Sequence, residues 1–395
     1  MNETELKDAP GAVQTDAKPD DSPEMTSEQL AEARRYGRIS LALTLADMAL
    51  DLVYLGVMAL VFARPLDAWL ASYQTPAWPH SYIRLLCVYL AVMGLHMFVS
   101  MPLSFYSGYV VEHQFGLSNQ SVRRWMRNWW LSNSLALGLG AALFAGLYFI
   151  MWNTGPYWWP IAAGAFFIVS VLLGQLAPVL IVPLFYKVEP IDNAELVERM
   201  NRLADGTGLT IEGVYRLGLS ADTSKANAAL AGLGRTRRVL MGDTLLDKFT
   251  PEEIEVIFAH EIGHHVHRHI PKMIAAGLVF SVAGFWLLDR VLVWWANIPS
   301  AADAPTSSLP LVMFTLGVFM TLLSPLQNAI SRHYERQCDR YALVRTGNHT
   351  AYRSAFSKLA RLNKADPEPN PIEVFLLHSH PPIKERLALA ERVAS

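Results

Sequence analysis

The stretch TPEEIEVIFAHEIGHH, residues 250–265, carries the strongest structural signal in this sequence. Its second half contains His260-Glu261-Ile262-Gly263-His264, an HExxH pattern. Two imidazoles four positions apart on a helix project from one face, about one turn apart, so both can bind a single metal ion. Glu261 lies beside the first histidine and can accept a proton from a water that zinc activates. The pattern therefore predicts a site for one Zn²⁺ per chain, with His260 and His264 as ligands and Glu261 as catalytic base.

The residues before the motif predict the helix that it requires. Thr250 and Glu253 form a potential capping box, and Pro251 occupies the first helical position. Pro271 predicts a break further along the chain.

Three more histidines follow the motif, at positions 265, 267 and 269. They increase the chance that HExxH arose by coincidence on a histidine-rich helix, so this alternative stays open on the pattern alone. Each of the three is better explained as a solvated side chain, or as a support for a ligand, than as a ligand itself.

Catalytic zinc usually has three protein ligands and one open position. Glu335 is the leading candidate for the third ligand, since it lies on a stretch with helical spacing. Asp339 follows one turn later, where its carboxylate can orient a metal-bound imidazole through the free N–H. Two alternatives remain from the residues alone. The two acids can pair with neighbouring arginines on a solvated helix, or His333 can be the third ligand.

The composition indicates a membrane protein. Of 395 residues, 52% are hydrophobic and 17% are charged, whereas soluble domains carry about 25% charged residues. The net charge of −2 argues against a nucleic-acid-binding surface. Two isolated cysteines predict no disulfide framework. The first thirty residues are polar and acidic, which favours a disordered tail over a signal peptide.

About six stretches have the roughly 20 apolar residues that a helix needs to cross a bilayer. They are residues 39–63, 83–106, 129–152, 158–182, 274–295 and 309–325. Asp47 and Asp51 lie within the first stretch, and because charge is costly there we expect them to face an interior cavity or a partner. Arginines cluster before the first stretch and after the second, so the positive-inside rule predicts cytosolic termini and a cytosolic segment 186–271.

That segment is predicted to form a small mixed domain. A helix is expected over 194–203, and strands over 211–219, 225–231 and 237–241, with Gly232 and Gly234 as breaks. After the last apolar stretch, helices are expected over 327–345, 351–363 and 382–394.

Together these motifs resemble the type I CAAX prenyl endopeptidase family, integral-membrane zinc proteases that have many bacterial relatives. The resemblance runs from the first apolar stretch to the C-terminus. Besides HExxH, four motifs in the family's order carry it: Glu112-His113-Gln114-Phe115-Gly116-Leu117-Ser118-Asn119; Ser224-Lys225-Ala226-Asn227-Ala228 with Gly232 and Gly234; Asn328-x-x-Ser331-Arg332-x-x-Glu335-x-x-x-Asp339; and Ser379-His380-Pro381-Pro382-x-x-x-Arg386.

The resemblance implies roles for further residues. Glu335 becomes the third zinc ligand, with Asp339 behind it, and His380 steadies the oxyanion of the tetrahedral intermediate. Arg386 and Arg332 support that wall of the site. Asn227 and Ala228 belong to an edge strand that pairs with an extended substrate. From the residues alone, His380 before two prolines can instead hold a turn, and so can Asn227.

The predicted fold is mainly α: a polytopic membrane protein with about six transmembrane helices and a gluzincin-type zinc protease domain that contains a small β-sheet. The expected divisions are a disordered acidic tail (1–32), a membrane domain with four spans (33–185), a first protease part (186–270), two further spans (271–326) and a second protease part (327–395). Eukaryotic members of the family have seven spans, and this chain lacks a counterpart of the first.

The expected partners are a peptide or protein substrate, prenylated or not, and the lipid bilayer, with no nucleic acid. Family activity is cleavage of prenylated CAAX C-termini. The alternatives are a quality-control protease for unprenylated membrane proteins and a non-catalytic zinc-containing scaffold, against which the intact Glu261 argues. A bacterial inner membrane is the first expectation for localisation, and endoplasmic reticulum the second.

Overall fold

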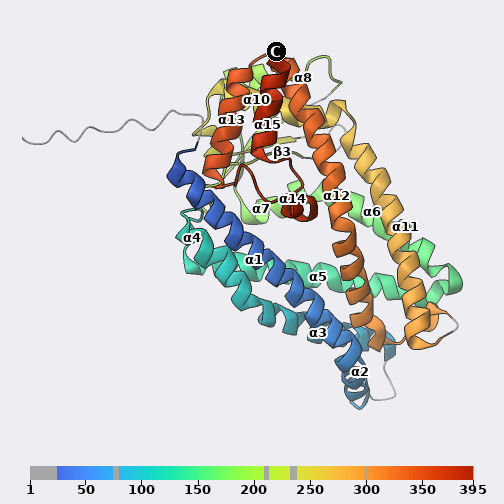
Figure 1. Cartoon of the computed structure of the whole chain (residues 1–395). Helices are drawn as coiled ribbons and strands as arrows, with labels where there is room; N and C mark the ends of the chain where they lie inside the picture. Colours follow the sequence, from blue (N-terminus) through green and yellow to red (C-terminus); the bar gives the residue numbers. More distant parts are fainter. Residues whose placement is uncertain (1–24, 74–79, 209–212, 232–237, 299, 395) are drawn as a thin grey trace, which may run out of the picture.

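The computed structural model describes residues 25–73, 80–208, 213–231, 238–298 and 300–394 (Figure 1). The predicted tail therefore lies outside the described residues up to position 24, as do Gly232 and Gly234. Helix α1 (Ser27–Val57) begins at Thr26, whose side chain accepts from the backbone N–H of Gln29 in a capping box. The tail boundary predicted at residue 32 is thus too late, because residues 27–32 are helical.

Five helical runs among the described residues are long and apolar enough to cross a membrane. The third, Val122–Phe185, spans 64 residues, about three bilayer thicknesses at 1.5 Å per residue. A 3₁₀ turn at Gly155–Tyr157 divides it into α5 and α6, which pack against each other. The predicted spans therefore correspond to α1, α3 (His80–Phe105), α5 (Val122–Thr154), α6 (Trp158–Leu176), α11 (His269–Ala296) and α12 (Leu309–Thr346).

Shorter segments link these helices. They are α2 (Ala63–Ala71), α4 (Glu112–Gln114), α7 (Val182–Phe185), the π-helical turns Met58–Phe62, Tyr106–Val111 and Ala177–Ile181, and the 3₁₀ turns Ala301–Asp303 and Thr306–Ser308.

Polar side chains within the membrane helices have partners, as charged groups at this depth require. Asp51 Oδ1 lies 2.8 Å from Nε2 of His96 on α3. Asp47 lines a polar cavity of about 370 Å³ between α1 and α3. Trp158 Nε1 donates to the buried Asp289 at 2.8 Å. The expectation for the two aspartates in the first span is confirmed by these contacts.

The remaining elements form a mixed α/β unit with its own hydrophobic core. Its sheet contains β1 (Val188–Pro190), β2 (Gly213–Leu217), β3 (Ala228–Ala231) and β4 (Arg238–Gly242) in the order β1-β2-β4-β3. Strands β2 and β4 are parallel, with Val214 opposite Val239, and both outer pairs are antiparallel. β3 is therefore an edge strand. The sequence predicted three of these strands and missed the short β1.

Helices pack against this sheet and against one another (Figure 1). They are α8 (Ala194–Ala204), α9 (Asp243–Leu246), α10 (Pro251–Val266), α13 (His349–Leu362) and α15 (Ile383–Ala394), whereas α14 (Pro371–Leu377) packs against α12. Val239, Phe258 and Tyr352 are fully buried where the sheet, α10 and α13 meet. This core fixes α10, the helix of the HExxH motif.

Helix α12 is longer than the sequence predicted. The expected span and the expected helix after it form one element of 38 residues, which continues through Pro325. Proline cannot donate to the carbonyl four residues earlier, here that of Thr321. The Ser324 hydroxyl donates to this carbonyl at 3.0 Å instead. One straight element therefore carries residues from the membrane region into the α/β unit.

The segment of the Glu112 motif joins the membrane helices to the sheet. Glu112 pairs with Lys225 at 2.8 Å and accepts from the Tyr36 hydroxyl at 2.6 Å. Ser118 and Thr223 form an isolated β-bridge. These contacts place α1 next to the residues that precede β3.

Candidate metal centre

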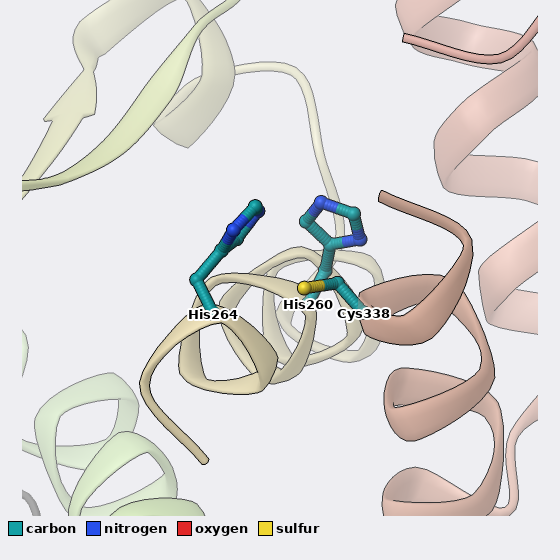
Figure 2. A group of neighbouring side chains, drawn as sticks. All are labelled: His260, His264 and Cys338. Carbon is teal, nitrogen blue, oxygen red and sulfur yellow. The ribbon is translucent and has the colours of Figure 1, made fainter. Parts of the chain in front are cut away.

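Helix α10 presents the two histidines of the HExxH motif. Its start is fixed as the sequence predicted, since Thr250 Oγ1 accepts from Glu253 N and Glu253 Oε2 accepts from Thr250 N at 2.8 Å. Both imidazole rings rise from the same side of the helix (Figure 2). The helix ends at Val266, and α11 begins at His269. The break therefore precedes Pro271, which lies in the first turn of α11.

Gly263 allows α12 to approach this helix closely. A Cβ at this position would lie 2.9 Å from Cα and 3.2 Å from Sγ of Cys338. Distances below about 3.0 Å between non-bonded carbons are prohibitive. The absence of a side chain thus brings the C-terminal half of α12 against the face that carries the histidines.

This approach places Glu335 between the two imidazoles. Its Oε2 lies 3.1 Å from Nε2 of His260, and its Oε1 lies 3.3 Å from Nε2 of His264. Ligand atoms around tetrahedral zinc, with bonds of 2.0–2.1 Å, are about 3.3 Å apart. The three side chains therefore have the spacing of a metal-ligand set.

Within the described part of the chain, one oxygen of the Glu335 carboxylate is not used in a hydrogen bond. Among the described residues, its Oε2 is a buried oxygen with no hydrogen-bond partner. A buried oxygen of this kind requires a donor or a cation. Two neutral imidazoles and one carboxylate suit zinc, so the residues present fit this metal.

Asp339 and Arg386 support His260 from behind. His260 Nδ1 lies 2.9 Å from Asp339 Oδ1, and Arg386 Nε donates to Asp339 Oδ2 at 3.0 Å. Burial disfavours the charged imidazole, but the neighbouring carboxylates of Asp339 and Glu335 outweigh this and raise the pKa of His260 to about 9. The two carboxylates therefore favour positive charge at this position.

Cys338 is a second candidate for the third ligand. Ligand atoms of His260, His264 and Cys338 all lie within 4.8 Å of one another. The thiol, however, lies at the base of the His260 side chain, next to the helix backbone (Figure 2). Its Sγ is also 3.6 Å from Nδ1 of His269. The Glu335 carboxylate instead lies 3.1 and 3.3 Å from the Nε2 atoms of His260 and His264.

A cavity of about 670 Å³ opens beside these residues. His260, Glu261 and His380 all line it. His380 Nε2 lies 3.5 Å from Glu335 Oε1, and the His380 side chain is 62% exposed. The structure thus brings His380 next to the buried cluster, on its open side.

Asn227 and Ala228 line the same cavity at the edge of the sheet. Ala228 begins β3 and pairs with Met241 of β4. The carbonyl of Asn227 accepts from Gly242 N at 2.9 Å. Because β3 has β4 on one side only, its other edge faces the cavity.

Arg332 makes its hydrogen bonds to backbone carbonyls of the segment 374–378. Its Nη1 donates to the carbonyls of Val374 at 2.7 Å and His378 at 2.5 Å. It therefore connects α12 to α14 and to the segment that leads to His380. The sequence did not predict α14, whose seven residues follow a proline-rich loop.

Sequence reasoning also missed Gln337. It contacts His269 at 2.8 Å, and its position two residues after Glu335 was the only available signal. His333, the rival third ligand, is exposed and contacts Gln337 at 3.0 Å.

Two family models match the chain. Residues 190–394 match peptidase family M48, and residues 14–187 match the CAAX prenyl protease N-terminal model, described as five membrane helices. An uncharacterized metalloprotease, YhfN of Bacillus subtilis, is 25% identical over 93% of this chain and 87% of its own length.

Eukaryotic relatives are similarly distant. The CAAX prenyl protease 1 homolog of Arabidopsis thaliana is 29% identical over 75% of this chain and 70% of its own length. CAAX prenyl protease 1 of Saccharomyces cerevisiae is 28% identical over 78% of this chain and 72% of its own length. The crystal structure of S. mikatae Ste24p has the same fold, with a TM-score of 0.74, 23% identity, and coverage of 95% of this chain and 91% of that one.

Proposed function

Because this chain belongs to peptidase family M48, and is thus a multi-pass membrane zinc metalloprotease, we propose that His260, His264 and Glu335 hold the zinc. The observation that carries this proposal is the position of the Glu335 carboxylate, 3.1 and 3.3 Å from the two Nε2 atoms. Asp339 and Arg386 hold His260 in place from the opposite side.

Zinc held by His260, His264 and Glu335 would polarise a peptide carbonyl and lower the pKa of a water to about 7. Glu261, which lines the same cavity, accepts the proton of the attacking water and delivers it to the leaving amine. His380 donates an N–H to the oxygen on which negative charge develops, from the exposed side of the cluster. Arg332 positions His380 through the backbone of the preceding segment.

The substrate is proposed to extend along β3. The free edge of this strand offers backbone hydrogen bonds to an extended peptide, and Asn227 and Ala228 lie beside the cavity. We propose that the scissile carbonyl of such a peptide lies between Glu261 and His380, which line the same cavity.

We propose prenylated CAAX C-termini as the substrate class. The cavity continues from His260 and Glu261 to residues of α1, including Leu41 and Thr44, which belong to a membrane-spanning run. A substrate whose peptide bond is hydrolysed beside Glu261 thus lies next to a membrane helix. Its prenyl group can then remain among apolar side chains. The names of the Arabidopsis and yeast relatives agree with this class.

The test compares three substrates with purified protein: a farnesylated CAAX peptide, the same peptide without farnesyl, and an unfolded membrane protein. We expect rapid cleavage of the farnesylated peptide and none by the Glu261→Gln variant. If only the unfolded membrane protein is cleaved, the proposal of CAAX processing is wrong and membrane protein quality control takes its place.

We also propose that both termini and the α/β unit face the cytosol, in a bacterial inner membrane or, as second choice, the endoplasmic reticulum. Two arginine clusters support this orientation: Arg34, Arg35 and Arg38 near the start of α1, and Arg123, Arg124 and Arg127 at the start of α5. We keep the predicted divisions at residues 185, 270 and 326 as our proposal for where the membrane parts and the protease parts of the chain meet. Protease protection of a C-terminal tag in inside-out vesicles would contradict the orientation.

A further inference from the structure

His264 has a hydrogen-bonded support that the proposed mechanism does not use. Its Nδ1 lies 3.2 Å from Nδ1 of His269. Nε2 of His269 lies 2.8 Å from Oε1 of Gln337, and Nε2 of Gln337 lies 3.0 Å from Nε2 of His333. These side chains form a continuous chain from the metal cluster to the exposed surface of α12.

Only one direction of this chain is compatible with a metal on His264. A neutral imidazole carries one proton, so a free lone pair on Nε2, which faces Glu335 at 3.3 Å, requires the proton on Nδ1. That Nδ1–H donates to Nδ1 of His269. His269 therefore carries its own proton on Nε2 and donates it to Oε1 of Gln337. The amide N–H of Gln337 then donates to His333.

The structure holds His269 in the place that this chain requires. The side chain is fully buried, so water cannot take the place of Gln337. Its ring stacks on Tyr334, with 4.1 Å between centroids and planes 12° apart. Arg268 precedes it with φ 53°, a left-handed conformation that non-glycine residues rarely adopt. This sharp change of direction between α10 and α11 returns His269 to the side of His264.

Cys338 is a competing donor to His269. Its Sγ lies 3.6 Å from Nδ1 of His269. A thiol is a weak donor, and the imidazole N–H of His264 is both closer and stronger. The lone pair of His269 is therefore directed to His264.

We propose that His269 and Gln337 are positioning residues that fix the tautomer and the ring orientation of His264 and thereby increase zinc affinity. The inference rests on the proposed function, since it takes His264 as a zinc ligand. Mutation of a residue that hydrogen-bonds to a metal ligand typically lowers metal affinity about 10- to 100-fold. The two histidines of the motif then have different supports: a charged carboxylate for His260, and a neutral imidazole and amide for His264.

The test measures zinc affinity of the full-length protein in detergent by competition with a chromophoric chelator. His269→Phe keeps the aromatic volume that stacks on Tyr334 but removes the acceptor, and we expect zinc to bind about 10- to 100-fold more weakly. Gln337→Met has the same length without an acceptor and should weaken binding in the same direction. Gln337→Glu restores an acceptor and should retain wild-type affinity. His267→Phe is the matched control, because His267 stacks on His269 at 5.5 Å, and its affinity should not change.

The outcomes separate this inference from the proposed function. Wild-type protein that binds no zinc, or that binds zinc without cleaving any peptide, would overturn the proposed function. Wild-type protein that binds and cleaves, with His269→Phe and Gln337→Met both within twofold of its zinc affinity, would overturn the inference alone. If His269→Phe fails to fold, the pair Gln337→Met and Gln337→Glu decides: equal affinities for the two contradict the inference.

Discussion

The two sides of the cavity are built in opposite ways. On the metal side, His260, Glu335 and Asp339 are buried, and each contacts a neighbouring polar side chain within 3.1 Å. On the substrate side, Asn227 is exposed and His380 is 62% exposed. The metal side is thus fixed before substrate arrives, whereas the substrate side is open enough to admit and release a peptide.

This difference explains why chemistry and binding can be separated by mutation. A change on the metal side should alter zinc content or protein stability as well as rate. A change on the substrate side should alter rate while zinc stays bound. The predictions that follow test this division from the largest expected effect to the smallest.

Glu261 lies where the two sides meet, and its replacement should have the largest effect on rate. Glu261→Gln keeps the size of the side chain but cannot accept a proton. Peptide turnover should fall by up to about 10⁴-fold, while elemental analysis still finds zinc at the wild-type level. The control is Glu255→Gln. Glu255 lies on the same helix as Glu261 and pairs with Arg199 of α8 at 3.6 Å. Full activity of Glu261→Gln would contradict its role as base.

Arg386 tests the buried ionic support of His260. Arg386→Met leaves the buried Asp339 carboxylate without its guanidinium, and loss of one partner of a buried pair costs about 3–5 kcal/mol. We expect a markedly lower melting temperature in detergent. The control is Arg336→Met, which removes the ion pair of Arg336 with Glu385 at 2.6 Å. Because Arg336 is 47% exposed, this loss should lower the free energy of unfolding by less than about 1 kcal/mol. Equal melting temperatures for the two variants would show that the metal side is not held by this pair.

His380 tests the open side. Its replacement in His380→Ala removes a donor to the developing oxyanion, and the loss of one such donor reduces kcat about 10²- to 10³-fold. Zinc affinity should stay at the wild-type level, because the imidazole lies outside the ligand set. His378→Ala is a useful comparison, since His378 lies two residues earlier and contacts Glu373 at 3.2 Å. If His380→Ala loses zinc, His380 belongs to the metal side instead.

Gly263 tests the close approach of α10 and α12. In Gly263→Ala, the new Cβ would lie 2.9 Å from Cα of Cys338, and overpacking of this kind costs about 1–3 kcal/mol. Thermal unfolding should show this loss together with weaker zinc binding. Gly277→Ala on α11 adds a Cβ that meets nothing within 4 Å and should leave stability unchanged or slightly higher. Unchanged stability of Gly263→Ala would mean that the helices can separate without cost.

The sequence predicted helix α10 and the membrane spans well because their signals are local. The capping box at Thr250, the HExxH spacing and the apolar lengths of the spans depend on residues close together in the chain. Ser324 shows where local signals mislead: Pro325 suggested a helix end, but the neighbouring hydroxyl compensates for the missing donor.

Long-range contacts could not be predicted in the same way. Gln337 supports His264 only because α10 ends at Val266 and Arg268 takes a left-handed conformation. No pattern in either segment specifies that contact. The choice between Glu335 and Cys338 has the same origin, since both residues lie on one turn of α12. Their different positions follow from packing: Cys338 lies against Gly263, and Glu335 lies beside the two Nε2 atoms.

X-ray absorption at the zinc edge of the wild-type protein tests the central assignment, that Glu335 completes the metal centre with His260 and His264, most directly. The account predicts a shell of nitrogen and oxygen atoms alone at about 2.0–2.1 Å, unchanged in Cys338→Ala. A sulfur atom at about 2.3 Å that disappears in Cys338→Ala would contradict it.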